Sequence, residues 1–243
     1  MISTYLLPAD VAARVLALAH EADVLLLGEI HGTQETPRLA LGLLPALGDA
    51  GYGALALEMP AGQREALLRH IASDGPPPAF FRASPGKFQD GRGNAQALSL
   101  ARQAVNAGWE LICFDQDSWK SGQQWRDRDA EMAANLWDQL RRLCPGKKAL
   151  GICGNCHSRL IAPVSETPFW PSFAFAAQRL RPDLVVRSIN VVFHDGEFFN
   201  GEIRRFGPPP DPLQGEAQLR PSDGMGHTLD LHLPHATAAT FLS

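Results

Sequence analysis

Four short apolar runs constrain the fold of this chain more than any other feature of its sequence. The runs are VLLLGEIH (24–31), ALALEMP (54–60), ELICFDQD (110–117) and ALGICGNCH (149–157). Each is continuously apolar and becomes polar at its end, which is typical of strands covered on both faces in a parallel sheet. Helical patterns separate the runs, at 36–53, 62–75, 94–108 and 125–146. This alternation predicts an α/β fold with a mostly parallel central sheet flanked by helices.

The part of the chain after residue 160 gives a weaker pattern. We expect a helix at 169–183 and a strand at 184–193, and then short strands at 196–203 and 227–234 that pair antiparallel at the edge of the sheet. Since no internal repeat occurs, we expect a single α/β domain over residues 1–243. Its motif-bearing core would cover about residues 24–160, and the C-terminal edge strands and loops about residues 161–243.

Prolines indicate where regular structure should stop. Within the helical pattern 36–53, Pro45 should kink or shorten the helix. The proline clusters at 74–81 and 205–215 should be loops, because each proline removes a backbone hydrogen-bond donor. Loops of this length in a compact domain tend to be lids or binding loops.

The charge balance limits the classes of partner. The formal net charge is -4, whereas a general nucleic-acid binder needs a basic surface, so we expect no nucleic-acid partner. No run of about 18 apolar residues occurs, so we expect no membrane span. Residues 1–23 lack a basic start and carry acids within a helical pattern, which predicts a helix and not a signal peptide. We therefore expect a cytoplasmic protein; the oligomeric state is not predicted.

Ionisable side chains collect where the four predicted strands end. They are Glu29, His31, Glu58, Asp115, Asp117 and His157, together with the polar, non-ionisable Asn155. Ligands of open parallel sheets bind outside the carboxyl ends of the strands, so we expect the binding site at this edge. Glu29 and Glu58 directly follow buried runs, and a carboxylate in such a place needs a partner or a shifted pKa.

The segment GICGNCHSR (151–159) is open to four interpretations. Cys153 and Cys156 have the spacing of a redox dithiol, and with His157 they match a c-type haem attachment pattern. Two cysteines and a histidine could instead hold zinc. In the fourth interpretation the working unit is G-x-x-H, a glycine three residues before a histidine, and the cysteines take no part.

Two G-x-x-H motifs with a glutamate between them form an ordered set in this chain. They lie at 28–31 in LLLGEIHGTQETP and at 154–157 in GICGNCH, with Glu58 in LEMP. The set resembles the superfamily that joins erythromycin esterases, the haem-binding lipoprotein ChaN, and the TraB and Tiki proteins. The segments QDGRGNAQAL (89–98) and RDAEMAANL (128–136) resemble two motifs of its esterase-like and ChaN-like branch, in which serine is often found where Asn94 stands. The resemblance covers about residues 24 to 160.

The resemblance favours the G-x-x-H interpretation over the other three. Covalent haem needs export, and no export signal is apparent; a structural zinc site needs a second Cys/His pair at suitable spacing. The glycine would let the backbone turn sharply at the strand end and deliver the histidine to the site. Cys153 is expected in the core, and Cys156 is kept as an alternative thiol nucleophile.

The resemblance implies a hydrolase that cleaves an ester or amide bond of a small-molecule or peptide substrate. The expected catalytic residues are Glu29, His31, Glu58 and His157. In one scheme His31, held by Glu29 or Glu58, is a general base that activates water. In the other, His31, Glu58 and His157 bind a divalent zinc, manganese or iron ion that lowers the pKa of bound water. The expected substrate-binding residues are Arg92, Arg128, Asn155 and Asp115.

Some assignments have a structural alternative. Arg92 and Arg128 could hold a substrate anion, or could form structural ion pairs with Asp90 or Asp129. The alternative function is a haem- or metal-binding protein of the ChaN-like type without turnover. Haem is less favoured, because Tyr5 and Tyr52 lie outside the matching segments. Of the remaining histidines, His20 and His70 are expected in solvent, and His227 on the surface.

Overall fold

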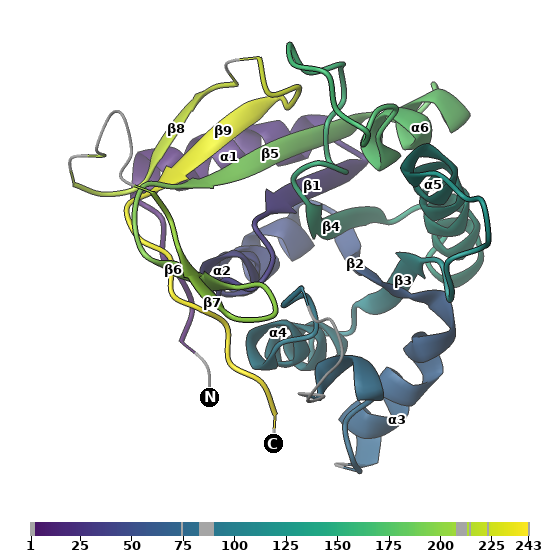
Figure 1. Cartoon of the computed structure of the whole chain (residues 1–243). Coiled ribbons are helices and arrows are strands. Elements are labelled where there is room, and N and C mark those ends of the chain that lie inside the picture. Colours follow the sequence, from purple (N-terminus) through teal and green to yellow (C-terminus); the bar gives the residue numbers. More distant parts are fainter. Residues whose placement is uncertain are drawn as a thin grey trace.

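A seven-stranded sheet forms the centre of the structure (Figure 1). The computed structural model describes residues 3–73, 75–82, 90–207, 213, 215–222 and 224–242. The strands, in the order β3-β2-β4-β1-β5-β9-β8, are Glu110–Asp115, Tyr52–Pro60, Lys148–Gly154, Val24–Glu29, Val186–Phe193, Leu229–Leu233 and Gln218–Pro221. All neighbours are parallel except β8, which pairs antiparallel with β9. The predicted mostly parallel sheet with an antiparallel edge is confirmed.

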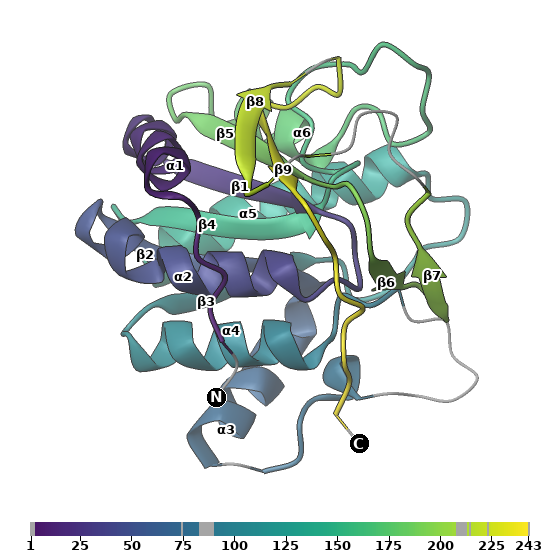
Figure 2. The same ribbon diagram turned by 90° about the vertical axis from the view of Figure 1, so that its left-hand side faces the viewer.

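Helices cover both faces of the sheet (Figures 1 and 2). Their bounds are Ala9–Glu21 for α1, Glu35–Asp49 for α2, Arg64–Ser73 for α3, Ala95–Asn106 for α4, Trp125–Leu143 for α5 and Phe173–Leu180 for α6. Short 3-10 turns lie at Ala61–Gln63 (η1) and Ala79–Phe81 (η2). Leu25 and Leu27 of β1 belong to the apolar cluster shared with α1, α2 and α4, whereas Leu26 belongs to the cluster shared with α5 and α6. The central strand is therefore buried on both sides, which explains its uninterrupted apolar run.

The ends of the helices follow local sequence signals. Asn94 caps α4 by accepting a hydrogen bond from the backbone N–H of Ala97 at 2.8 Å. Asparagine and serine are both preferred at this position, so the departure from serine preserves the cap. Gln124 and Asp127 form a capping box at the start of α5. Pro45 does not end α2, which continues to Asp49.

The C-terminal third differs from the prediction in two places. The first predicted strand, 196–203, contributes β6 (Glu197–Phe199), which pairs with β7 (Ile203–Arg205) as a hairpin outside the main sheet. The second, at 227–234, contains β9, which pairs parallel with β5 on one side and antiparallel with the edge strand β8 on the other, so its antiparallel partner is β8 and not the segment 196–203. Residues 234–242 then pass beside the N-termini of α2 and α4, where the backbone N–H of Ala239 donates to Gly32 and that of Ala95 donates to Thr240. Among the helices of the described residues, none combines the length and the apolar composition of a membrane span.

Candidate active site

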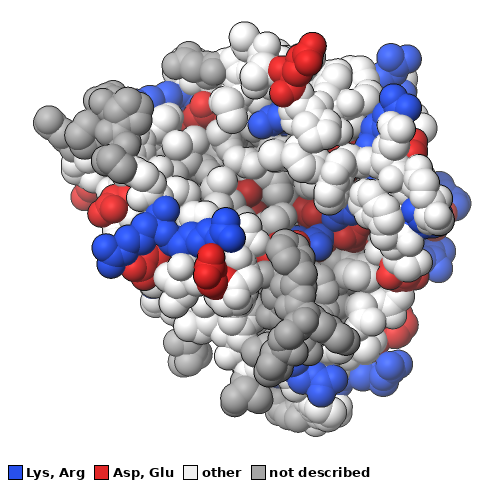
Figure 3. All heavy atoms as spheres, viewed as in Figure 1, with Lys and Arg blue, Asp and Glu red and all other residues white. Residues whose placement is uncertain are grey.

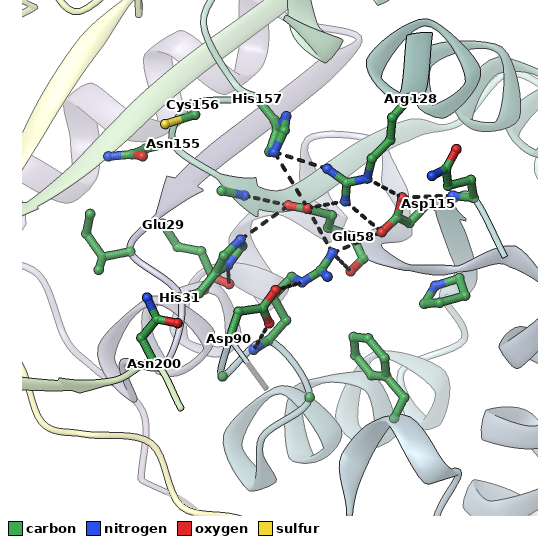
Figure 4. Close-up of a pocket in the computed structure, with 18 of the residues that line it drawn as sticks. Glu29, His31, Glu58, Asp90, Asp115, Arg128, Asn155, Cys156, His157 and Asn200 are labelled. Atoms are coloured by element: carbon green, nitrogen blue, oxygen red, sulfur yellow. Dashed lines mark hydrogen bonds and ion pairs between the residues drawn. The ribbon is translucent and has the colours of Figure 1, made fainter. Parts of the chain in front are cut away.

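A cavity of about 810 Å³ opens at the carboxyl ends of β1, β2, β3 and β4. All eight residues that the sequence nominated for the site line it, namely Glu29, His31, Glu58, Arg92, Asp115, Arg128, Asn155 and His157. Acidic and basic side chains meet in the hollow at the centre of the face shown in Figure 3. The close-up in Figure 4 shows these side chains converging from different strands and loops on Glu58 and His31. The predicted location of the site is thus where the cavity lies.

His31 lies between two carboxylates and faces the cavity. Its Nδ1 is 2.9 Å from Glu29 Oε1, and its Nε2 is 3.7 Å from Glu58 Oε2. The side chain of His31 is 22% exposed, whereas those of the two glutamates are 6% and 3% exposed. Burial by itself lowers the pKa of His31, but the adjacent Glu58 and Glu29 outweigh it and raise the pKa above its ordinary value. Burial raises the pKa of Glu29, and the adjacent His31 opposes that shift.

Glu58 is the acceptor at the centre of the site. Its Oε1 accepts from Arg92 Nη1 at 2.9 Å and from Arg128 Nη2 at 2.7 Å, while its Oε2 accepts from the backbone N–H of Gly154 at 2.7 Å. Burial opposes ionisation of this carboxyl, yet the positive charges around it hold its pKa well below the ordinary range. Glu58 is therefore an anion that is fixed by three donors.

All three side-chain nitrogens of Arg128 donate hydrogen bonds within the protein. Arg128 donates to both oxygens of Asp115, at 2.9 and 2.7 Å, in addition to Glu58. Its side chain is only 6% exposed, and burial is outweighed by Glu58 and Asp115, which raise the pKa of the guanidinium. The predicted alternative of an ion pair between Arg128 and Asp129 is wrong in its partner, because Asp129 binds His157.

Arg92 is less enclosed. It pairs with Asp90 through Nε at 2.8 Å and with Asp115 through Nη1 at 2.9 Å. Its side chain is 21% exposed, and its Nη2 makes no hydrogen bond with the described residues. The structural ion pair with Asp90 therefore exists, and among the described residues Nη2 of Arg92 has no acceptor.

His157 is held from both sides within the protein. Its Nδ1 lies 2.7 and 3.0 Å from the two carboxylate oxygens of Asp129, and Arg128 Nη1 donates to its Nε2 at 3.1 Å. Because a guanidinium can only donate, Nε2 must accept, so the proton of a neutral ring is assigned to Nδ1. Burial raises the pKa of Asp129. His157 thus links Asp129 to the arginine network.

The three predicted metal ligands do not fit a shared metal ion in this arrangement. The acceptor nitrogen of His157 is taken by Arg128, and Glu58 Oε1 is taken by two guanidinium groups. These positive charges lie where the divalent ion would have to bind, and like charges repel. The described residues also contain no group of three or more histidine, cysteine or acidic side chains arranged to hold a metal. The chemistry proposed below therefore uses side chains alone.

The glycines of the two G-x-x-H motifs have a different role from the predicted one. Neither Gly28 nor Gly154 has a positive φ, so neither makes a turn that only glycine allows. A Cβ on Gly154 would lie 2.8 Å from Nε2 of His31, and one on Gly28 would lie 2.2 Å from Oγ of Ser158. These positions are glycine because the neighbouring side chains approach the backbone closely, and Gly154 makes the space in which His31 lies.

The cysteines of GICGNCHSR are free thiols. Cys153 is buried as predicted, and Cys156 lines the cavity in a half-buried position. Burial raises the pKa of Cys156, which disfavours the thiolate that a nucleophile or a metal ligand requires.

Two histidines that were expected in solvent are buried. His70 contacts the backbone of Gly75 and the side chain of Arg102. His227 lies behind the second G-x-x-H segment, where its Nε2 is 3.0 Å from both Ser158 Oγ and the backbone oxygen of Asn155. Its Nδ1 is buried without a hydrogen-bond partner among the described residues. His70 follows Leu67 by three residues in the predicted helix 62–75, so the helical spacing could have indicated its burial. The burial of His227 could not be inferred, because it depends on contacts with a segment about 70 residues earlier in the chain.

Comparisons with known proteins connect the chain to others through its fold. No protein-family model and no curated protein sequence matches it. Among solved structures, a mutant of the erythromycin esterase EreC in its open conformation has a TM-score of 0.62 at 11% identity, covering 95% of each chain. A protein of Bacillus cereus has a TM-score of 0.59 at 11% identity, covering 93% of this chain and 92% of that one.

The type III effector HopBA1 has a TM-score of 0.56 at 15% identity, covering 98% of each chain. At these identities the likeness establishes a shared fold over nearly the whole chain.

Proposed function

We propose that this protein hydrolyses an ester or amide bond in the cavity, with His31 as the general base. One observation carries the proposal: Nδ1 of His31 is bound by Glu29, while the ring lines the cavity with 22% of its side chain exposed. Its Nε2 makes no hydrogen bond with the described residues and has Glu58 Oε2 as a neighbour at 3.7 Å. A carboxylate behind an imidazole fixes its tautomer and stabilises the imidazolium that forms when the ring accepts a proton.

In the proposed reaction, His31 Nε2 removes a proton from a water molecule as the water oxygen bonds to the substrate carbonyl carbon. The carbonyl electron pair moves to its oxygen and gives a tetrahedral anion. When the anion collapses, the bond to the leaving group breaks, and the alkoxide or amine takes the proton from His31. A positioned base of this kind contributes roughly 10²–10⁴-fold to the rate.

The negatively charged oxygen of the tetrahedral intermediate needs hydrogen-bond donors that stabilise it. Nη2 of Arg92 and the side-chain amide of Asn155 make no hydrogen bond with the described residues, although both residues line the cavity. Arg128 is committed to Glu58, Asp115 and His157. We therefore assign the oxyanion to Arg92 and Asn155, and we assign Arg128 to positioning the site.

The fold gives this proposal further support. The EreC structure is that of an esterase, and this chain has the same fold over 95% of its length. That likeness favours a hydrolase over the alternative of a haem-binding protein, and the enclosed Nε2 of His157 is a second observation against haem at that residue.

The test is a panel of p-nitrophenyl esters, lactones and short peptides, assayed with and without a chelator. We expect hydrolysis of at least one ester, a loss of roughly 100-fold or more in His31→Ala, and no change in His20→Ala, whose histidine is exposed on α1. Full activity in His31→Ala would contradict the proposal. An absorption spectrum of the purified protein tests the alternative, because a Soret band without hydrolysis would favour haem binding.

A further inference from the structure

One wall of the cavity is built from three aromatic rings, Trp119, Trp125 and Phe169, which we call the aromatic wall. The rings of Trp119 and Trp125 lie 4.8 Å apart at 66°, and those of Trp125 and Phe169 lie 4.9 Å apart at 58°. All three line the cavity, and Trp125 and Phe169 also contact His157. The aromatic wall therefore lies next to the charged side chains of the site, through His157 and its partner Arg128.

Two of these rings are unusually open to solvent for large apolar side chains. Trp119 is 50% exposed and Trp125 is 39% exposed. The segment that carries Trp119 is held by hydrogen bonds between Gln123 and both Gln116 and Lys120. Exposed apolar rings on a segment that is fixed in place indicate a surface that a ligand covers.

The charges around the aromatic wall indicate the sign of the charge that the ligand carries. The ionisable carboxylates that line the cavity are Glu29, Glu58, Asp90, Asp115 and Asp117, against the two guanidinium groups of Arg92 and Arg128. Both arginines are already paired with carboxylates. Asp117, two residues before Trp119, accepts from the backbone N–H of Gly62 at 2.6 Å and has no ion pair with the described residues. The loop that carries Trp119 thus holds one carboxylate, that of Asp117, with no cationic partner among the described residues.

We propose that the aromatic wall binds an organic cation, a trialkylammonium or tetraalkylammonium group carried by the substrate. A cation over an indole face is attracted by the ring quadrupole. Because the Arg128 guanidinium already lies 5.7 Å from the ring of Trp125, we place the ligand cation over Trp119, the more exposed of the two indole rings. The negative charge of Asp117 attracts a cation, whereas a neutral aromatic or alkyl group gains no such attraction. The assignment rests on the proposed function in one respect, that the ester bond of the same substrate lies at His31.

The binding test uses choline and its neutral isostere, 3,3-dimethylbutan-1-ol, which differ only in the charge of the bulky end. Quenching of tryptophan fluorescence reports binding without turnover. We expect choline to bind at least tenfold more tightly than the alcohol in the wild type. Trp119→Ala and Asp117→Asn should remove most of this preference, whereas Asp183→Asn, an exposed carboxylate next to the amino end of β5, should leave it unchanged.

The matched esters, acetylcholine and 3,3-dimethylbutyl acetate, extend the test to catalysis. We expect kcat/KM to favour acetylcholine at least tenfold in the wild type and to approach equality in Trp119→Ala. Equal binding of choline and the alcohol, or tighter binding of phenol than of choline, would overturn the cation proposal. If choline binds but neither ester nor any of the panel substrates is cleaved, the proposed function fails while the ligand class stands.

Discussion

The two histidines of the G-x-x-H motifs occupy the same place in the sequence pattern but different environments. His31 has carboxylates near both ring nitrogens and is 22% exposed. His157 has a carboxylate on one side and Arg128 on the other, and its side chain is 8% exposed. A repeated motif has therefore produced one histidine that faces the cavity and one that braces the charge network.

Arg128 creates this difference. It donates to Nε2 of His157 while it binds Glu58 and Asp115, and it leaves His31 untouched. The contrast teaches that the identity of a side chain and its spacing from a strand end do not determine its role, because the partner of its second ring nitrogen does.

The largest expected effect is a loss of stability on removing Arg128, which binds His157, Glu58 and Asp115 together. Arg128→Leu leaves Glu58 and Asp115 buried with one cationic partner fewer, and breaking a buried ion pair by removing one partner costs about 3–5 kcal/mol. We expect that loss in the free energy of unfolding measured with urea. Arg126→Leu, at an exposed position of the same helix, is the control and should change stability by less than about 0.5 kcal/mol. Equal effects of the two substitutions would show that the network does not stabilise the fold.

The second effect is a pH-dependent loss of stability at His227, which lies behind the segment that carries His157. Burial lowers the pKa of His227 to about 4, from an ordinary value of 6.5. The unfolded chain therefore binds a proton before the folded protein does, and stability is lost as pH falls from 6.5 toward 4, by on the order of 3 kcal/mol. In His227→Gln this part of the loss should be absent. Identical pH dependence of unfolding in the two proteins would place His227 outside this role.

The smallest effect is a loss of activity from a shift of the His31 ring alone. In Gly154→Ala the new Cβ would meet His31 Nε2 at 2.8 Å, so the ring must shift at little cost to the fold. Since misplacement of a catalytic group by about 1 Å can cost as much as 10²-fold, we expect kcat/KM for a cleaved ester to fall roughly 10–100-fold. The melting temperature should change little. Gly48→Ala, where a Cβ has no neighbour closer than 3.9 Å, is the matched control.

Much of the fold, and the edge of the sheet at which the cavity lies, could be predicted from the sequence. Continuous apolar runs identify buried parallel strands because both faces of such strands are covered, and β1 is buried at every residue. Polar residues at strand ends then identify the cavity, since parallel strands bring their carboxyl ends to one edge. For this reason Glu29, Glu58 and His157, far apart in the chain, were expected together and line the same cavity.

The pairing of side chains within the cavity could not be predicted. Whether Arg128 contacts Asp129 or Asp115 depends on how α5 is rotated against β3, and sequence spacing does not report that rotation. The position of β9 beside β5 and the burial of His227 also depend on long-range contacts of the C-terminal third. The role of Gly154 follows only from the ring that lies against it.

The most direct test of His31 as the base is the pH dependence of kcat/KM, measured for the wild type and for Glu29→Gln with the same ester. The active form carries a neutral His31, and Glu58 and Glu29 raise the pKa of this histidine against the opposing effect of burial. The wild-type rate should therefore rise with pH along a limb centred above 6.5. Removing the charge of Glu29 should move that limb to lower pH. A limb that stays in place in Glu29→Gln, or a rate with no ascending limb, would contradict the assignment.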